Sequence, residues 1–466
     1  MSSPSENSFL QGPLGSIYIK TALPVIFVMG MNGLLSVADA WFLGRYVGPD
    51  ALAAVTLMFP IYMLVVALAT LVSNGMSSLL AREFGAGDSP MARTVFAQSH
   101  GLAVALGALL IVLFLSVGEQ VVMLAAGGSE TLADMGVIYL RITIFFSPLL
   151  FVLGINQDAL RNEGRVGFMA AMSLFVSVAN ILFNYVLIAQ LEMGVAGSAY
   201  GTALAQLVAF VILLVFRLKG DTQLRPRHVV RHFGFSKWPG ILALGAPQSL
   251  GFVGLALGSG SVVIALQFVA SPTFTETMTA YGIITRVLTF VFLPLLGLGH
   301  AMQTITGNNF GAKEWRRTDQ SVKIGILIAL IYCISFQLVL TLFAEPLALM
   351  FVSDPVVVAE VGRILPILTI LFFATGPLMM VATYFQAIGD AGRAAILGLT
   401  KPYLFALPLT FILSSLLGES GIWIAGPLSE FLLFVLTAGV LLQVNRSQSL
   451  RWGLFRSPSQ RMEAAE

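Results

Sequence analysis

Charged residues are scarce in this sequence. Of its 466 residues only 10% are charged, whereas 57% are hydrophobic, and the mean hydropathy is +0.89. A soluble globular protein carries about 25% charged residues. So few charges cannot cover so apolar a chain in water, which excludes a soluble protein and predicts a surface that faces lipid. The apolar stretches are continuous rather than alternating, which favours an all-α membrane protein over a β-barrel.

Cysteine and histidine are also rare. The single cysteine, Cys333, cannot form an internal disulfide, and we expect it to pack as a small hydrophobe. His228 and His232 are four residues apart, but no carboxylate or cysteine accompanies them in their basic loop. That loop favours contact with anionic headgroups of membrane lipid over a metal site. We therefore expect no metal and no cofactor, and the formal net charge of +2 gives no reason to expect a nucleic-acid partner.

Sequence signatures of enzymes are missing as well. The chain has no HExxH, P-loop or GxSxG motif, so we expect no catalytic residue and no enzyme, and no ATP-driven pump. Energy for any transport would come from an ion gradient or from the gradient of the substrate. The first residues, MSSPSENSFLQGPLGS, lack a basic segment followed by a short apolar core, which predicts no cleavable signal peptide.

Long apolar runs dominate what is present. A membrane-spanning helix needs about 20 mostly apolar residues. Twelve such runs occur, at residues 17–43, 51–80, 95–118, 133–155, 167–189, 196–217, 238–268, 279–304, 321–344, 361–388, 395–417 and 422–443. Basic residues, among them Arg217, Arg225 and Lys401, fall mainly on one side of these runs. The positive-inside rule then predicts a multi-pass inner (plasma) membrane protein with both termini in the cytoplasm.

The two halves of the chain repeat. The segment REFGAGDSPMART resembles NNFGAKEWRRTDQ, and QDALRNEGR resembles FQAIGDAGR, with Gly164 matching Gly392 at a shift of 228 residues. Pro24 in the first run matches Pro247 in the seventh at a shift of 223. Because each half has an even number of helices, both enter the membrane from the same side. This predicts two six-helix lobes related by a parallel pseudo-two-fold along the membrane normal.

We expect four segments along the chain. They are an N-terminal lobe at 1–220, a cytoplasmic linker at 221–237, a C-terminal lobe at 238–445 and a cytoplasmic tail at 446–466.

Two carboxylates lie well inside predicted spans, whereas most other acidic residues lie in loops or at helix ends. Burying a charge in a membrane costs about 2.5–3.5 kcal/mol on insertion scales, so such a residue is usually functional. Asp39 lies in the first span with Asn32 and Ser36 on the same helical face, and we favour it as functional. Glu430 is the secondary acidic candidate, because snorkelling or a helix-packing hydrogen bond explains it equally well. Pro24 removes a backbone hydrogen bond from the first helix and predicts a kink there.

Polar side chains also occur in the fifth and sixth runs. Asn180 and Asn184 are one helical turn apart, and Thr202 lies near the start of the next helix. From the residues alone, each is better explained as an interhelical hydrogen-bonding group than as part of a functional site.

The order and spacing of these motifs resemble the multidrug and toxin extrusion (MATE) family. The resemblance rests on DAWFLGR around Asp39, FGAGD, the pair QDALRNEGR and FQAIGDAGR, NILFNYVLI, and GIWIAGPLSE, and it covers nearly the whole chain. It is greatest for the DinF-like prokaryotic branch. Acidic residues of the NorM-like kind have no obvious counterpart in the seventh and tenth helices.

The resemblance implies a function and a site. It implies alternating-access antiport of H⁺ or Na⁺ against amphipathic, often cationic, drug-like compounds, by a chain that we expect to be a monomer. Its cation or proton coupling site would be Asp39, Asn180, Asn184 and Thr202. Where many relatives carry Asp, position 184 is Asn, which halves the formal charge of the site and favours H⁺. Asn32 and Gln157 are candidate substrate contacts.

Other functions fit the sequence less well. A flippase for lipid-linked saccharides has a related two-lobed architecture, but it would need arginines lining a cleft for a pyrophosphate. Arg141 and Arg286 are the nearest candidates, and both are expected at outer helix ends. An ion channel, or a scaffold without turnover, is disfavoured because the repeat carries its favoured carboxylate in one half only.

Overall fold

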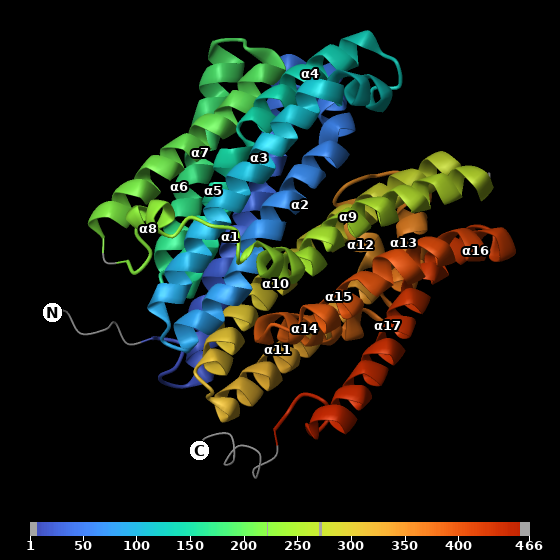
Figure 1. Ribbon diagram of the computed structural model, residues 1–466. Helices are drawn as coiled ribbons and strands as arrows, with labels where there is room; N and C mark the ends of the chain where they lie inside the picture. Colours follow the sequence, from blue (N-terminus) through green and yellow to red (C-terminus); the bar gives the residue numbers. More distant parts are fainter. Residues whose placement is uncertain (1–6, 221, 270–272, 457–466) are drawn as a thin grey trace. The chain divides into compact units, whose positions relative to one another are not determined.

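The chain is almost entirely helical. The computed structural model describes residues 7–220, 222–269 and 273–456 (Figure 1). Within these ranges there is no named strand, and only an isolated bridge joins Arg451 to Phe455. The all-α prediction is therefore confirmed.

The helices follow one another with short connections. In the first half they are α1 (Leu14–Phe42), the π-helix η1 (Leu43–Val47), α2 (Pro49–Gly85), α3 (Ser89–Ala125), α4 (Glu130–Phe145), α5 (Ser147–Asn162), α6 (Val166–Asn184), the π-helix η2 (Tyr185–Gln190), α7 (Gly194–Lys219) and α8 (Pro226–Arg231). In the second half they are α9 (Trp238–Val269), α10 (Phe274–Gly311), α11 (Trp315–Leu342), α12 (Ala344–Leu349), α13 (Pro355–Thr369), α14 (Phe372–Ile388), α15 (Ala391–Thr400), the π-helix η3 (Lys401–Ala406), α16 (Leu407–Leu417) and α17 (Glu419–Gln448).

Ten of the described helical stretches are long and apolar enough to cross a membrane. Two further pairs, α4 with α5 and α13 with α14, pass the same test together but are bent by 48° and 44°. Counting each bent pair as one span gives up to twelve, in the order predicted from the sequence. The fourth and tenth predicted spans are thus broken helices rather than straight ones.

Side chains stabilise the breaks. Between α13 and α14, the amide of Gln337 donates to Ile370 O at 2.9 Å and accepts from Phe373 N at 2.8 Å. Both ends of one amide therefore satisfy backbone groups that the bend releases, which is required where no water is available. In the other pair, Pro148 stands in the first turn of α5, where its missing N–H is not needed.

The described chain divides into two compact units. The N-terminal unit holds Leu23–Phe252 and the described residues up to Gln11. The C-terminal unit holds Gly12–Ala22 and the described residues from Val253 onward. Each unit has its own apolar core, one around Met76 and Phe151 and the other around Trp423.

Two helices are shared between the units. The first residues of α1 belong to the C-terminal unit, where the buried Tyr18 hydroxyl donates to Ser321 O at 2.7 Å. The first half of α9 belongs to the N-terminal unit, where Gly245 lies directly against the backbone of Leu71 in α2. A Cβ at position 245 would overlap Leu71 O, so only glycine permits this helix contact.

Candidate functional site

A chain of hydrogen bonds joins α1, α6 and α7 inside the N-terminal unit. Asn184 Nδ2 donates to Asp39 Oδ1 at 2.5 Å and to Asn180 Oδ1 at 3.2 Å. Asn180 Nδ2 in turn donates to Thr202 Oγ1 at 3.0 Å. The four side chains selected from the sequence as a coupling site therefore lie together.

The middle of the cluster is buried, and its two end residues are partly exposed. Asn184 and Asn180 are only 0% and 2% exposed, whereas Asp39 and Thr202 are partly exposed. Both N–H groups of Asn184 donate hydrogen bonds, so the partially positive NH2 end of its amide faces Asp39. The other end, Oδ1, is buried and has no hydrogen-bond partner in the part of the chain that the structure describes.

Local backbone geometry positions these side chains. Asn184 is the last residue of α6, directly before η2, and Asp39 lies one turn before η1. A π-turn inserts an extra residue into a helix and is frequent at functional sites. Across from Asn184, Gly201 of α7 leaves room for its amide, because a Cβ there would overlap Asn184 Oδ1.

Two tyrosines that the sequence did not single out lie near the carboxylate. The hydroxyls of Tyr62 in α2 and Tyr139 in α4 are within electrostatic range of Asp39. Nothing in the local sequence distinguishes them from other tyrosines in apolar helices, because their approach to Asp39 depends on the packing of α2 and α4.

The remaining candidates lie elsewhere. Asn32 and Gln157 have exposed side chains, and no hydrogen bond among the described residues links either to the Asp39 cluster. Pro24 lies inside the continuous helix α1. Glu430 is 6% exposed in the C-terminal unit and pairs with Lys401 of η3.

Lys401 is a residue that the sequence analysis missed. It was grouped there with the cytoplasmic basic residues, yet it lies well inside the candidate span Ala391–Leu417. The signal was present, since a lysine within a predicted span is as unusual as an aspartate.

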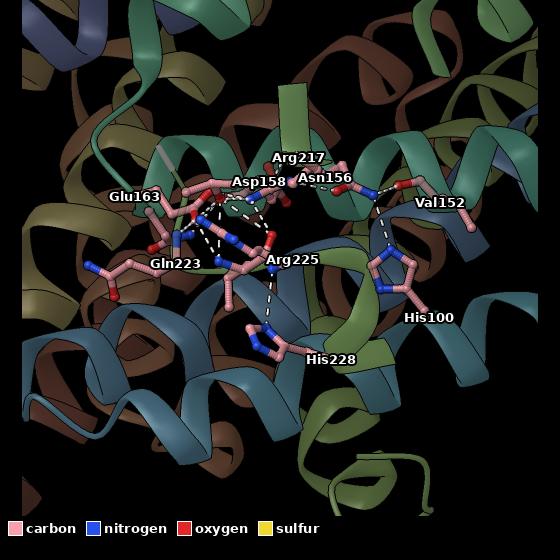
Figure 2. Close-up of polar contacts among 12 residues, drawn as sticks. His100, Val152, Asn156, Asp158, Glu163, Arg217, Gln223, Arg225 and His228 are labelled. Carbon is pink, nitrogen blue, oxygen red and sulfur yellow. Dashed lines mark hydrogen bonds and ion pairs between the residues drawn. The ribbon is translucent and has the colours of Figure 1, made fainter. Parts of the chain in front are cut away.

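A second polar network anchors the linker to the N-terminal unit (Figure 2). Arg217, at the end of α7, donates to Glu163 Oε2 at 2.5 Å and to Leu224 O at 3.2 Å. Glu163 Oε1 accepts from Thr222 Oγ1 at 2.6 Å and from Leu224 N at 3.1 Å. The Arg217 and Glu163 side chains are 2% and 4% exposed. A buried ion pair thus fixes the position of the chain that follows α7.

The same network extends to two histidines. Asn156 Oδ1 accepts from Arg217 Nε at 3.2 Å, and Asn156 Nδ2 lies 3.1 Å from His100 Nε2. On the linker side, His228 Nδ1 accepts from Arg225 N at 3.2 Å. Burial, with help from Arg93 and other nearby arginines, lowers the pKa of His228 to about 4. His228 is therefore neutral at physiological pH, as its acceptor role requires.

The features described so far define the class of protein. A polytopic helical chain with two compact units, broken spans and a carboxylate hydrogen-bonded inside one unit is built as a membrane transporter. The MatE family model matches residues 24–186 and 257–412, more than half of the chain. The chain belongs to the MatE family of multidrug and toxin extrusion transporters and is not an enzyme.

Individual relatives are distant in sequence but similar over most of their length. The chain is 25% identical over 402 residues to the probable multidrug resistance protein YoeA of Bacillus subtilis, covering 82% of this chain and 84% of that protein. It is 23% identical over 434 residues to an FAD transporter of Shewanella oneidensis, with coverage of 92% and 94%. The multidrug export protein MepA of Staphylococcus aureus is 22% identical over 419 residues, with coverage of 89% and 90%.

Solved structures share the fold. An outward-facing multidrug resistance MATE family transporter aligns with a TM-score of 0.84 at 23% identity, over 94% of this chain and 97% of that one. A transporter from Pyrococcus furiosus, described by a reversed polarity of its binding pocket, also aligns at 0.84, with 22% identity and the same coverage.

Proposed function

We propose that this protein exports amphipathic, often cationic, organic compounds by antiport against H⁺ or Na⁺. The single observation that carries the proposal is the hydrogen-bonded set of Asp39, Asn184, Asn180 and Thr202 in the N-terminal unit. The multidrug export ascribed to relatives such as MepA supports the substrate class. The assignment to the DinF-like branch, a monomeric state and a cytoplasmic location of both termini are parts of the same proposal.

Protonation of Asp39 would change the hydrogen bonding of the whole cluster. As a carboxylate, Asp39 accepts from Asn184; as a neutral acid it gains a hydrogen of its own and can donate. Asn184 Oδ1, which has no partner among the described residues, becomes the natural acceptor once the amide turns over. That rotation would break the hydrogen bond from Asn184 to Asn180, and so alter the hydrogen bond from Asn180 to Thr202. A proton at Asp39 is thereby transmitted from α1 to α6 and α7.

The same oxygens also suit a small hard cation. Asp39, Asn180, Asn184 and Thr202 offer carboxylate, amide and hydroxyl oxygens, the ligands that such cations prefer in proteins. The charge of one carboxylate balances one Na⁺ or one H⁺, so the donor set permits either ion. Only one formal negative charge is present, and for that reason we favour H⁺.

The flippase alternative gains no support from its candidate arginines. Arg141 pairs with Glu119, and the two side chains are 54% and 72% exposed. Arg286 also has an exposed side chain. Neither is a buried arginine of the kind expected to bind a pyrophosphate.

The decisive variant is Asp39→Asn. Asparagine is nearly isosteric but cannot cycle between charged and neutral forms, so export of an ethidium-like dye driven by an imposed pH or Na⁺ gradient in proteoliposomes should fall to background. Expression should stay normal, because removing a charge from a membrane-spanning helix lowers the cost of inserting that helix. The matched control is Asp50→Asn, which changes an exposed carboxylate in the first turn of α2. If Asp39→Asn exports dye with the parent's dependence on the gradient, Asp39 is structural and the proposal fails.

A further inference from the structure

The C-terminal unit contains a charged pair in the middle of its membrane-spanning helices. Lys401 Nζ donates to Glu430 Oε2, joining η3 to α17. Lys401 lies about 15 Å along its span from Ala391, and Glu430 lies about 16 Å along α17 from Glu419, at a helical rise of 1.5 Å per residue. For helices that enter the membrane at these ends, both distances equal about half the thickness of a hydrocarbon layer, which is about 30 Å. At that depth, neither charge is explained by snorkelling to a membrane surface.

The two partners are unequally buried. The Glu430 side chain is 6% exposed, whereas that of Lys401 is 33% exposed. An ammonium group has three donors. Among the residues that the structure describes, Glu430 is the one hydrogen-bond partner of the Lys401 ammonium, so donors remain on its exposed side. The pair therefore presents a cation to whatever occupies that side.

The pair stands where the internal repeat predicts a functional position. The shift of 228 residues that relates Gly164 to Gly392 also relates Thr202 to Glu430. The shift of 223 that relates Pro24 to Pro247 places Val262 opposite Asp39. The C-terminal unit thus has an apolar residue in place of the coupling carboxylate and a lysine with its counterion on the helices that match α6 and α7. The two units thus carry different charged groups: a single carboxylate in the N-terminal unit and an ion pair in the C-terminal unit.

Packing against neighbouring helices fixes the backbone around Lys401. Lys401 is the first residue of the π-helix η3, as Tyr185 is of η2 beside the coupling site. Pro402 and Tyr403 pack against α9 at Gly254, where a Cβ would come within 2.7 Å of Pro402 Cβ and 3.3 Å of Tyr403 Cε2. This close contact holds η3 against α9, while η3 also packs on α17.

We propose that the ammonium of Lys401 binds an anionic group, such as a carboxylate, of a transported amphipathic molecule. When no such group is bound, the ammonium pairs with Glu430 instead. The incoming anion and Glu430 then compete for one cation. A charge-assisted hydrogen bond is strong enough to change affinity by about tenfold or more. The inference extends the proposed exporter from cations to zwitterions and anions, and it rests on that proposal.

Binding of two matched dyes tests this site. Rhodamine B carries a free carboxylate, and its ethyl ester carries none. Dissociation constants of both are measured by fluorescence anisotropy with the purified full-length chain, in the parent, in Glu430→Gln and in the double variant Lys401→Gln/Glu430→Gln. The double variant leaves no unpaired buried charge, so it should fold. Arg393→Gln is the control, since it breaks the partly exposed pair that Arg393, in the same span as Lys401, forms with Asp390.

Competition predicts effects in opposite directions. Glu430→Gln should lower the dissociation constant of rhodamine B by about tenfold, because an uncharged amide no longer competes for Lys401. The double variant should lose that gain and bind rhodamine B more weakly than the parent does. The ester should change by less than about twofold in every variant, and Arg393→Gln should change neither dye. Equal changes for both dyes, or weaker rhodamine B binding in Glu430→Gln, would show a purely structural pair. If the parent binds the ester, but the affinity for rhodamine B does not depend on Lys401, this inference alone is overturned. If the parent binds neither dye, the exporter proposal is overturned as well.

Discussion

Asn184 is the residue on which the N-terminal site depends. Its two N–H groups are shared between Asp39 and Asn180, and its oxygen is buried without a partner among the described residues. An aspartate at this position would lack both donors and would place a second negative charge beside Asp39. Asparagine therefore makes Asp39 the single charge of the site and gives its carboxylate a fixed hydrogen bond.

Gly201 offers a test of this geometry that changes no charge. In Gly201→Ala the new methyl group would overlap Asn184 Oδ1, and overpacking of this kind costs about 1–3 kcal/mol. We expect Asn184 to be displaced from Asp39 and gradient-driven dye export to fall roughly tenfold. Gly167→Ala in α6 is the control, because a Cβ there meets open space. Unchanged export in Gly201→Ala would mean that the position of Asn184 does not matter.

At the scale of elements, helix breaks and π-turns occur next to the polar residues. The π-helices η1 and η2 adjoin Asp39 and Asn184, and η3 begins at Lys401. Irregular backbone inside a membrane is tolerated only where protein or a polar cavity satisfies the released groups. Gln337 does so at the break between α13 and α14. At that break, a polar side chain and free backbone groups thus satisfy each other's hydrogen bonds.

The Arg217–Glu163 pair is the element-scale contact whose loss should be most costly. Removing one partner of a buried ion pair destabilises by about 3–5 kcal/mol, because the other charge is left unpaired. Glu163→Gln should therefore melt at a clearly lower temperature in detergent, and Glu163→Gln/Arg217→Gln should regain part of the loss. The control is Glu119→Gln, whose exposed pair with Arg141 contributes about 0–1 kcal/mol. Equal melting temperatures for the two single variants would contradict an anchoring role for this pair.

At the scale of the whole molecule, the chain is organised as two compact units that share α1 and α9. Tyr18 binds the first residues of α1 to the C-terminal unit, and Gly245 packs the first half of α9 onto α2 of the N-terminal unit. The described linker is also part of the N-terminal unit, because Arg217 and Glu163 fix its first residues. The chain therefore passes between units within helices rather than within a loop.

Membrane orientation is a prediction of the same scale. The excess of basic residues predicts that position 225 faces the cytoplasm and position 276 the outside. Single cysteines introduced as Arg225→Cys and Glu276→Cys, in a chain whose buried Cys333 is replaced by serine, should react with an impermeant maleimide from opposite sides of the membrane. Labelling of position 225 from outside intact cells would reverse the orientation.

Much of the architecture follows from local sequence. Lipid requires about 20 apolar residues per span, so hydropathy alone locates the spans, including those later seen to bend. Asp39 could be selected because a charge in such a run is rare and costly. Asn180 and Asn184 are one turn apart on one helix, so their shared face was also readable from the sequence.

Only the tertiary structure decided which of these groups meet. Asn184 lies 145 residues from Asp39 in sequence, and their hydrogen bond depends on how α6 packs against α1 and on the space left by Gly201. The same holds for Lys401, whose place inside a predicted span was readable from the sequence, but whose partner Glu430 is set by the packing of η3 on α17. A sequence reveals which charges need partners, because burial is costly at any place in the membrane; which partner each one finds is set by contacts between helices that are distant along the chain.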